Sequence, residues 1–230
     1  VNANKDILKE NEISLKENYP SIIGFKKLGN YIFLVYENFV YSNRTTSIYF
    51  LEIDKIALSV ISKKEVTNFK DQKATAPHYS FSISPDTSKL LLFVELPQRM
   101  NDNEKFNITV FDDGMNKIWG QEVELPIAYK YIILYDEDVT DNGKVFISLK
   151  HFDKEVSRQA IREDGDKVPS YSYKIFTLAK NQKQKEVSFK LDKIGGQFIN
   201  VRDNKNGNVT AAFLYKNHYD GSVSGVFYTT

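Results

Sequence analysis

The sequence repeats one pattern four times, a polar corner followed directly by an apolar, strand-like run. The corners occupy residues 28–30, 84–89, 140–144 and 204–208, and their last residues lie 59, 55 and 64 positions apart. The Gly, Asn and Asp in these corners suit tight connections that need left-handed or side-chain-stabilised backbone. A repeat of this length predicts that one small structural unit is used several times.

A second set of residues supports the same period. Four segments share a Glu, a β-branched residue, a small or polar residue and then an apolar residue. They are residues 12–15, 65–69, 122–125 and 186–189, and their first residues lie 53, 57 and 64 positions apart. The two sets use different residues and have nearly the same spacing, so the repeat does not depend on one motif.

Each full repeat contains four candidate strands, most clearly at residues 79–84, 90–95, 106–111 and 118–125. A repeat of about 40 to 60 residues with four antiparallel strands is typical of a propeller blade. We therefore expect an all-β chain, a single β-propeller domain over residues 1–230. The alternative architecture is a β-sandwich. The expected blades span approximately residues 20–69, 78–125, 131–190 and 197–230, the last completed by residues 7–15.

The last expected blade lacks its outer strand, because the chain stops after the run at residues 223–228. Residues 7–15 carry the outer-strand pattern without inner strands before them. Pairing of these two segments would close the ring and remove two open sheet edges. The other possibility is that the chain forms part of a larger propeller.

One corner carries a family resemblance. Ser84, Pro85 and Asp86, followed by Ser88 and Lys89, resemble the Ser-Pro-Asp-Gly-Ser-Lys corner of Tol-type β-propeller repeats. Thr stands here where Gly is usual, and the other three corners lack Ser-Pro-Asp. The resemblance implies a propeller and no particular function, because propellers serve as enzymes, ligand binders and scaffolds.

Composition restricts the partners. The chain has 31 Lys and Arg against 30 Asp and Glu, so it lacks the basic field that holds nucleic acid. It has no Cys, which excludes disulfides and Cys-ligated zinc. No run reaches the roughly 18 apolar residues of a membrane-spanning helix. The start at Val1, without Met, is consistent with a processed precursor, and we expect an exported protein, periplasmic or on the cell surface.

Three histidines are expected on one loop-rich face of such a propeller. Two of them begin matching triplets, His-Phe-Asp at 151–153 and His-Tyr-Asp at 218–220. Imidazole and carboxylate together suit a divalent cation or an anionic ligand. The alternative is a polar turn beside an aromatic residue that packs on the sheet. A metal site needs three or four ligands, so we predict neither a metal nor a cofactor. The candidate ligand-binding residues are His78, His151, Asp153, His218 and Asp220.

The longest connection, residues 151–170, contains Arg158 and Arg162. These residues would share one face of a helical turn and would there hold an acidic sugar or another carboxylate. The alternative is that they are solvated surface charges. Arg44 and Arg99 occupy the corresponding connections of the first two repeats.

The sequence contains no nucleophile elbow, phosphate-binding Gly-rich loop or metalloprotease helix. We therefore expect a non-catalytic binding or scaffold module that presents one loop-rich face to a protein or glycan. Two alternatives stay open: an exported carbohydrate-active or metal-dependent enzyme, and a structural fragment of a larger envelope protein. The single Trp119 is expected in the core between blades.

Overall fold

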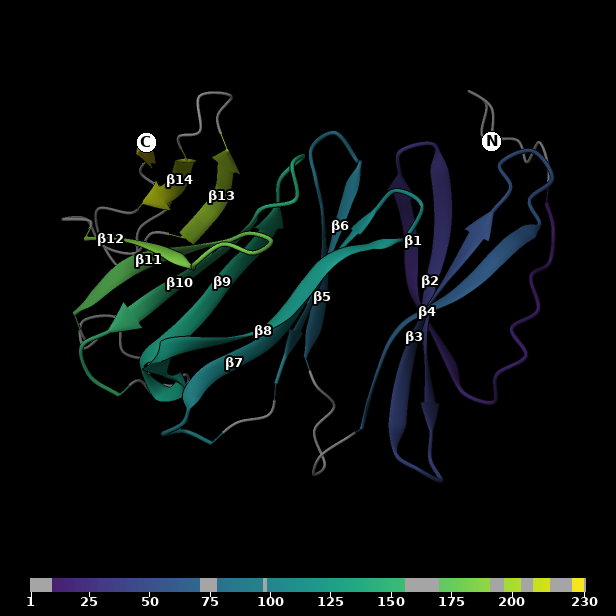
Figure 1. Cartoon of the computed structure of the whole chain (residues 1–230), viewed down its shortest axis with the longest axis horizontal. Helices are drawn as coiled ribbons and strands as arrows, with labels where there is room; N and C mark the ends of the chain where they lie inside the picture. Colours follow the sequence, from purple (N-terminus) through teal and green to yellow (C-terminus); the bar gives the residue numbers. More distant parts are fainter. Residues whose placement is uncertain are drawn as a thin grey trace. The chain divides into compact units, whose positions relative to one another are not determined.

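The computed structural model describes residues 10–70, 78–96, 99–155, 170–190, 197–203, 209–215 and 225–229. Within these ranges the regular structure is almost entirely β-strand, arranged in four antiparallel sheets (Figure 1). The expected all-β class is confirmed. The chain divides into two compact units, Val1–Pro77 and His78–Thr230.

The first unit contains one sheet in which each strand pairs with the next along the chain. Its strands are β1 (Pro20–Leu28), β2 (Tyr31–Val40), β3 (Thr45–Ile53) and β4 (Val60–Lys70). The corner at residues 28–30 joins β1 to β2, and Gly29 has φ 51° there. Glycine adopts this left-handed conformation without steric cost, which explains its place in the corner.

The second unit contains three more sheets with the same sequential strand order. The first has β5 (Tyr79–Ile83), β6 (Lys89–Glu95), β7 (Asn103–Asp112) and β8 (Lys117–Ala128). After the short helix η1 (Tyr129–Tyr131), the second has β9 (Ile132–Val139), β10 (Val145–Phe152), β11 (Tyr171–Leu178) and β12 (Lys185–Phe189). The third has β13 (Gln197–Asp203), β14 (Val209–Tyr215) and β15 (Gly225–Thr229).

The corners before β6 and β10 have equivalent hydrogen bonds. The backbone N–H of Ser84 donates to the carbonyl of Lys89 (3.0 Å), and that of Thr140 donates to the carbonyl of Lys144 (2.9 Å). In each corner the hydroxyl accepts a bond from the same lysine's backbone N–H, at 2.9 Å and 3.0 Å respectively. The corners before β6 and β10 therefore share one hydrogen-bond pattern.

The sheet β9–β12 is covered on both faces by its neighbours. Val145, Ile147 and Leu149 of β10 belong to a core shared with the sheet β5–β8. Phe146, on the opposite face of β10, packs with Val201 of β13 and with Ala211 and Phe213 of β14. Successive residues of a strand point to opposite faces, so β10 needs apolar residues at nearly every position.

The N-terminal segment differs from its expected role. Residues 10–16 form no strand, and the described strand β15 pairs with β14 alone. Ile13 and Leu15 instead pack on a cluster in the first unit formed by Leu34, Tyr36, Leu51 and Ile53. The outer strand expected at residues 7–15 is thus not formed by residues 10–15. Alternating apolar residues bury one side equally well by lying on the face of a sheet.

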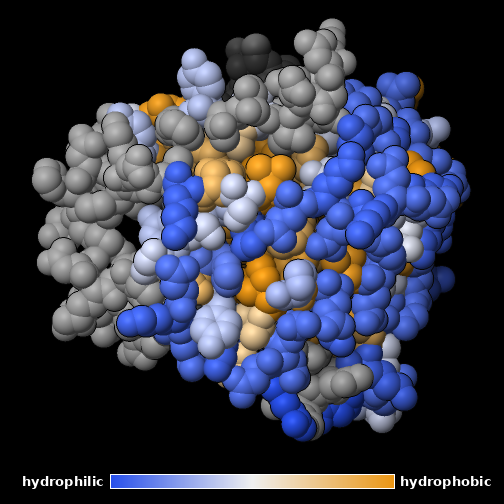
Figure 2. Space-filling view, turned by 60° about the vertical axis from the view of Figure 1, so that its left-hand side comes forward, coloured by the Kyte–Doolittle hydropathy of each residue, from blue (hydrophilic) through white to orange (hydrophobic). Residues whose placement is uncertain are grey.

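Figure 2 shows hydrophobic residues interleaved with hydrophilic ones on the face turned toward the viewer. Scattered exposed apolar side chains are normal for a folded protein. In the described part of the chain, we find no helix with the length and apolar character that crossing a membrane requires.

Candidate functional site

The edge strands β5 and β9 belong to different sheets and contact each other through side chains. The Ser80 hydroxyl donates a hydrogen bond to the Glu137 carboxylate. The Ser82 hydroxyl donates to Oδ1 of Asp138 at 2.8 Å. Residue numbers rise together along the two strands, so the strands run parallel. We call this row of hydroxyl–carboxylate contacts the β5–β9 seam.

The seam continues into the turns that follow the two strands. The backbone N–H of Asp86 donates to Oδ1 of Asp141 at 3.0 Å. Oδ1 of Asp86 accepts bonds from the Ser84 hydroxyl (2.7 Å) and the Ser88 N–H (2.8 Å). Burial alone would raise the pKa of Asp86, but hydrogen bonds from Ser88 and Ser84 outweigh it and lower the pKa to about 2.

Glu137 is the carboxyl of the β5–β9 seam that has a raised pKa. Burial raises the pKa of Glu137 above the usual glutamate range. The Ser80 hydrogen bond and the nearby His78 oppose this shift, while the charges of Asp136 and Asp138 add to it. A carboxyl with a raised pKa, held by a hydroxyl, has the properties of a general acid or base.

His78, a predicted site residue, lies directly before β5 at one end of this seam. Its Nδ1 is 3.8 Å from Oε2 of Glu95, and 76% of its side chain is exposed. The structure therefore places one predicted histidine beside two carboxylates, Glu95 and Glu137.

His151 and Asp153 lie at the end of β10. His151 is half-buried, and burial lowers its pKa, an effect that nearby Lys174 strengthens and Asp153 and Glu186 oppose. The Asp153 backbone N–H donates to the carbonyl of Ser170 at 2.9 Å, which closes the base of the long connection. The electrostatic neighbours of His151 are thus different from those of His78.

The other predicted site residues are not located by the structure. Arg158 and Arg162 fall in residues 156–169, and His218 and Asp220 fall in residues 216–224, all outside the described residues. Within the described ranges, no group of three or more His, Asp or Glu side chains is arranged to hold a metal ion.

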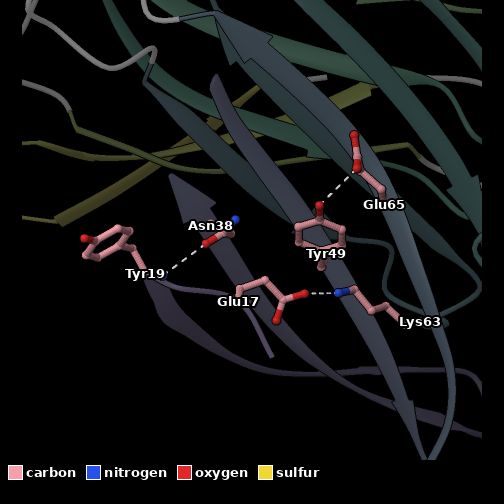
Figure 3. A network of polar contacts seen from close by, with 6 residues as sticks. All are labelled: Glu17, Tyr19, Asn38, Tyr49, Lys63 and Glu65. Carbon is pink, nitrogen blue, oxygen red and sulfur yellow. Dashed lines mark hydrogen bonds and ion pairs between the residues drawn. The ribbon is translucent and has the colours of Figure 1, made fainter. Parts of the chain in front are cut away.

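The first unit has a polar network that fixes its N-terminal strap, which we define as residues 11–19 (Figure 3). The Asn11 amide donates to the carbonyl of Leu58 at 3.0 Å. The Tyr19 backbone N–H donates to Oδ1 of Asn38 at 3.3 Å. These bonds hold the two ends of the strap on the sheet β1–β4.

Between these ends, Glu17 forms an ion pair with Lys63 of β4. The Lys63 ammonium also lies 4.3 Å from the ring centroid of Tyr49, whose hydroxyl donates to Oε2 of Glu65 at 3.1 Å. Burial would lower the pKa of Lys63, but its ion pair with Glu17 and the nearby Tyr36 side chain raise it to about 12. The network secures the strap and contains no group of perturbed acidity suited to proton transfer near neutral pH.

A buried lysine forms a further cluster that sequence reasoning missed. Lys150 of β10 is only 8% exposed. Its ammonium lies over three tyrosine rings, at 4.6 Å from the centroid of Tyr171, 5.0 Å from Tyr135 and 5.4 Å from Tyr173. We call these four residues the Lys150 cage.

The seam was also missed, although it has a sequence signal. Residues 136–138 read Asp-Glu-Asp inside a strand. Acidic residues are depleted in strands, so three in succession indicate an unusual environment. No single motif identifies the site, because its hydroxyls come from β5, more than fifty residues earlier.

No family model and no curated protein matches this chain. Several solved structures do. The cobalt-substituted Synechocystis ACO is 10% identical, with a TM-score of 0.48 over 92% of this chain and 47% of that chain. An ACO/RPE65 chimera is 8% identical, with the same TM-score and coverage. A mutant of the Synechocystis apocarotenoid oxygenase (ACO) is 9% identical, again with a TM-score of 0.48 over 92% and 47%. The chain thus spans about half the length of these structures.

The matching structures are those of an oxygenase, an enzyme, and so do not bear out the expectation of a non-catalytic binding or scaffold module. At such low identity and TM-score, the likeness carries no argument about the substrate or reaction of this chain. A site assembled from separate strands, such as the β5–β9 seam, leaves no contiguous motif in the sequence.

Proposed function

We propose that this chain is a β-propeller segment of an enzyme that performs acid–base chemistry at the β5–β9 seam. The sequential four-stranded sheets and the equivalent corners before β6 and β10 support the propeller. So do the contacts that β9 makes with both β5 and β13, the first strands of the neighbouring sheets. In a propeller, the first strand of each blade is the innermost one and lies near the first strands of the neighbouring blades.

The enzymatic proposal rests on the raised pKa and the hydrogen bonding of the Glu137 carboxyl. Its carboxyl is half-buried, has a raised pKa and accepts a hydrogen bond from Ser80. Such a group donates or accepts a proton more effectively near neutral pH than an ordinary glutamate. Asp138 supplies a second carboxylate on the same strand, bound to Ser82.

The proposed substrate is a hydroxyl-rich compound such as a glycan. Carboxylates and hydroxyls in one row offer hydrogen-bond acceptors and donors to several sugar hydroxyls at once. Glu137 protonates or deprotonates the reacting oxygen, and the Ser80 hydroxyl keeps the carboxyl in position.

The proposal is tested with the purified chain, a panel of chromogenic glycosides and soluble polysaccharides, and assays for reducing ends and unsaturated products. Glu137→Gln is expected to lower kcat at least about 100-fold, the usual contribution of a general acid or base. Glu186→Gln, which removes a carboxylate from the outer strand β12, is the matched control and keeps full activity. Equal activity of the wild type and Glu137→Gln on every cleaved substrate would contradict the assignment.

A binding measurement covers the case in which no panel substrate is cleaved. The side-chain carboxyl carbons of glutamate are labelled with carbon-13, and the Glu137 resonance is assigned by its loss in Glu137→Gln. Its titration is expected above that of ordinary glutamates and is expected to shift when a bound glycan is added. If the Glu137 resonance titrates like those of the other glutamates and its chemical shift does not change with any glycan, the seam is not the binding site.

A further inference from the structure

The Lys150 cage lies on the face of the sheet β9–β12 that packs against the sheet β13–β15. Register pairs Lys150 with Tyr173, and both Tyr173 and Phe146 belong to the core between these two sheets. Tyr135 and Tyr171 pack against the same core. The ammonium is therefore surrounded by aromatic and apolar side chains rather than by water.

The neighbouring Lys174, unlike Lys150, has a carboxylate partner that stabilises its positive charge. Lys174 on β11 forms an ion pair with Glu186 of β12. Among the described residues, no carboxylate is paired with Lys150 in the same way, and burial alone lowers its pKa to about 8. At pH 7 about one tenth of such amines are neutral, against about one in 3,000 for a lysine of ordinary pKa. A neutral amine is a nucleophile, and an ammonium is not.

We infer that Lys150 is a nucleophilic amine that condenses with a small uncharged aldehyde or ketone to form an imine. The amine lone pair attacks the carbonyl carbon, and a proton passes from nitrogen to oxygen to give a carbinolamine. Loss of the hydroxyl group with the second amine proton then releases one water and leaves a C=N bond. No oxidant or reductant is consumed.

Imine formation would remove a buried charge that no carboxylate among the described residues neutralises. Imine formation from the neutral amine leaves an uncharged group, which an aromatic enclosure accommodates without the cost of a buried charge. The three rings also offer flat apolar surface to the carbon chain of the carbonyl compound. The inference is independent of the seam, because Lys150 is on another strand and faces another sheet.

Reductive trapping on the whole chain tests this inference. Propanal is added with cyanoborohydride at pH 7, the imine is reduced to a stable propyl-lysine, and peptide mapping gives the rate at each lysine. Lys150 is expected to react at least about 10-fold faster than Lys174, the matched lysine in the same sheet. Reaction at Lys150 that is no faster than at Lys174, or is absent, shows that the cage is only a structural cation–π contact and overturns the inference.

A second variant separates chemistry from folding. Lys150→Arg keeps a cation within the tyrosine rings but cannot form an imine, so it is expected to fold and to lose the fast-reacting site. If Lys150→Arg retains the fast phase, another lysine is responsible and the assignment is wrong. If the variant does not fold, the comparison of Lys150 with Lys174 within the wild-type chain still decides the outcome.

Discussion

The indole N–H of Trp119 donates a hydrogen bond to the carbonyl of Gly143 at 3.0 Å. Trp119 lies on β8 and Gly143 in the corner between β9 and β10, so the bond joins two successive sheets. Gly143 has φ 78°, a left-handed conformation that exposes its carbonyl to the indole. The Trp119 side chain also belongs to the core shared by the two sheets, which confirms the expected position of this residue.

We predict that Trp119→Phe lowers the free energy of unfolding by about 1 to 2 kcal/mol, because the ring packing largely remains and the hydrogen bond is lost. Trp119→Ala is expected to cost about 3 to 5 kcal/mol, since it also leaves a cavity. Urea denaturation followed by circular dichroism measures both. Tyr228→Ala, at a side chain that is 73% exposed, is the control. Equal losses for Phe and Ala would show that packing contributes nothing at this junction.

A second prediction concerns Glu137 and pH. The folded-state pKa of Glu137 is raised, so between its ordinary value and this raised value the folded state holds a proton that the unfolded chain has released. The free energy of unfolding attributable to this group therefore falls as pH rises through that window, and the loss is complete above it.

Glu137→Gln removes the buried charge while its amide oxygen still accepts the Ser80 hydrogen bond. We expect this variant to melt a few degrees above the wild type at pH 8 and at the same temperature at pH 4, as measured by calorimetry. A lower melting temperature at pH 8 would show that the ionised carboxylate stabilises the junction of the two sheets. Glu122→Gln, at an exposed position of β8, controls for the general effect of losing one negative charge.

The strands next to the corners were the most predictable part of the fold. The expected runs at residues 90–95 and 145–150 correspond to β6 and β10, in which apolar residues fill most positions. Residues 12–15 were misassigned because a strand on a sheet edge and a strap on a sheet face both need alternating apolar residues. Thr87, which stands where the Tol-type corner has Gly, adopts φ 62°, a conformation in which glycine would be unstrained. That resemblance, the predicted export and the single-domain organisation stay predictions.

The candidate site was less predictable than the strands. His78 was found by residue type, but its neighbour Glu137 lies almost sixty residues away in another sheet. Lys150 ends an apolar run in the sequence, and its cage depends on tyrosines from β9 and β11. Sequence spacing alone does not say which side chains on different strands share a face and meet.

A third prediction concerns the N-terminal strap. Ile13 and Leu15 are half-buried on the sheet β1–β4, whereas Ser14 and Lys16 are exposed. Leu15→Asp is expected to release the strap, because an unpaired carboxylate is disfavoured in the apolar cluster. Hydrogen exchange of the amides in residues 11–19 is expected to accelerate at least 10-fold, while Ser14→Asp leaves it unchanged. Equal exchange in Leu15→Asp and Ser14→Asp would show that the apolar contacts do not hold the strap.

The ion pair of the strap is expected to contribute less than its apolar contacts. Glu17→Gln breaks only a partly exposed ion pair and is expected to lower the free energy of unfolding by less than about 1 kcal/mol.

The last prediction is a rise in stability with pH that depends on Lys150. Burial lowers the pKa of Lys150 to about 8 from a usual value of 10.5. Below pH 8 both the folded and the unfolded chain hold the proton, and the folded state carries the full cost of the buried charge. Between pH 8 and 10.5 the folded state releases a proton that the unfolded chain keeps, so the free energy of unfolding rises with pH, by at most about 3 kcal/mol.

Lys150→Met fills the cage without a charge and removes this pH dependence. Its stability relative to the wild type is expected to be highest at pH 7 and to decrease steadily toward pH 10, because only the wild type gains in that range. The difference between the two proteins in urea denaturation at pH 7, 8.5 and 10 isolates Lys150 from all other titrating groups. Lys185→Met, at an exposed lysine of β12, shows the effect of removing one positive charge from the surface. A difference between Lys150→Met and the wild type that stays constant across this range would mean that the tyrosine rings compensate fully for the burial of the ammonium.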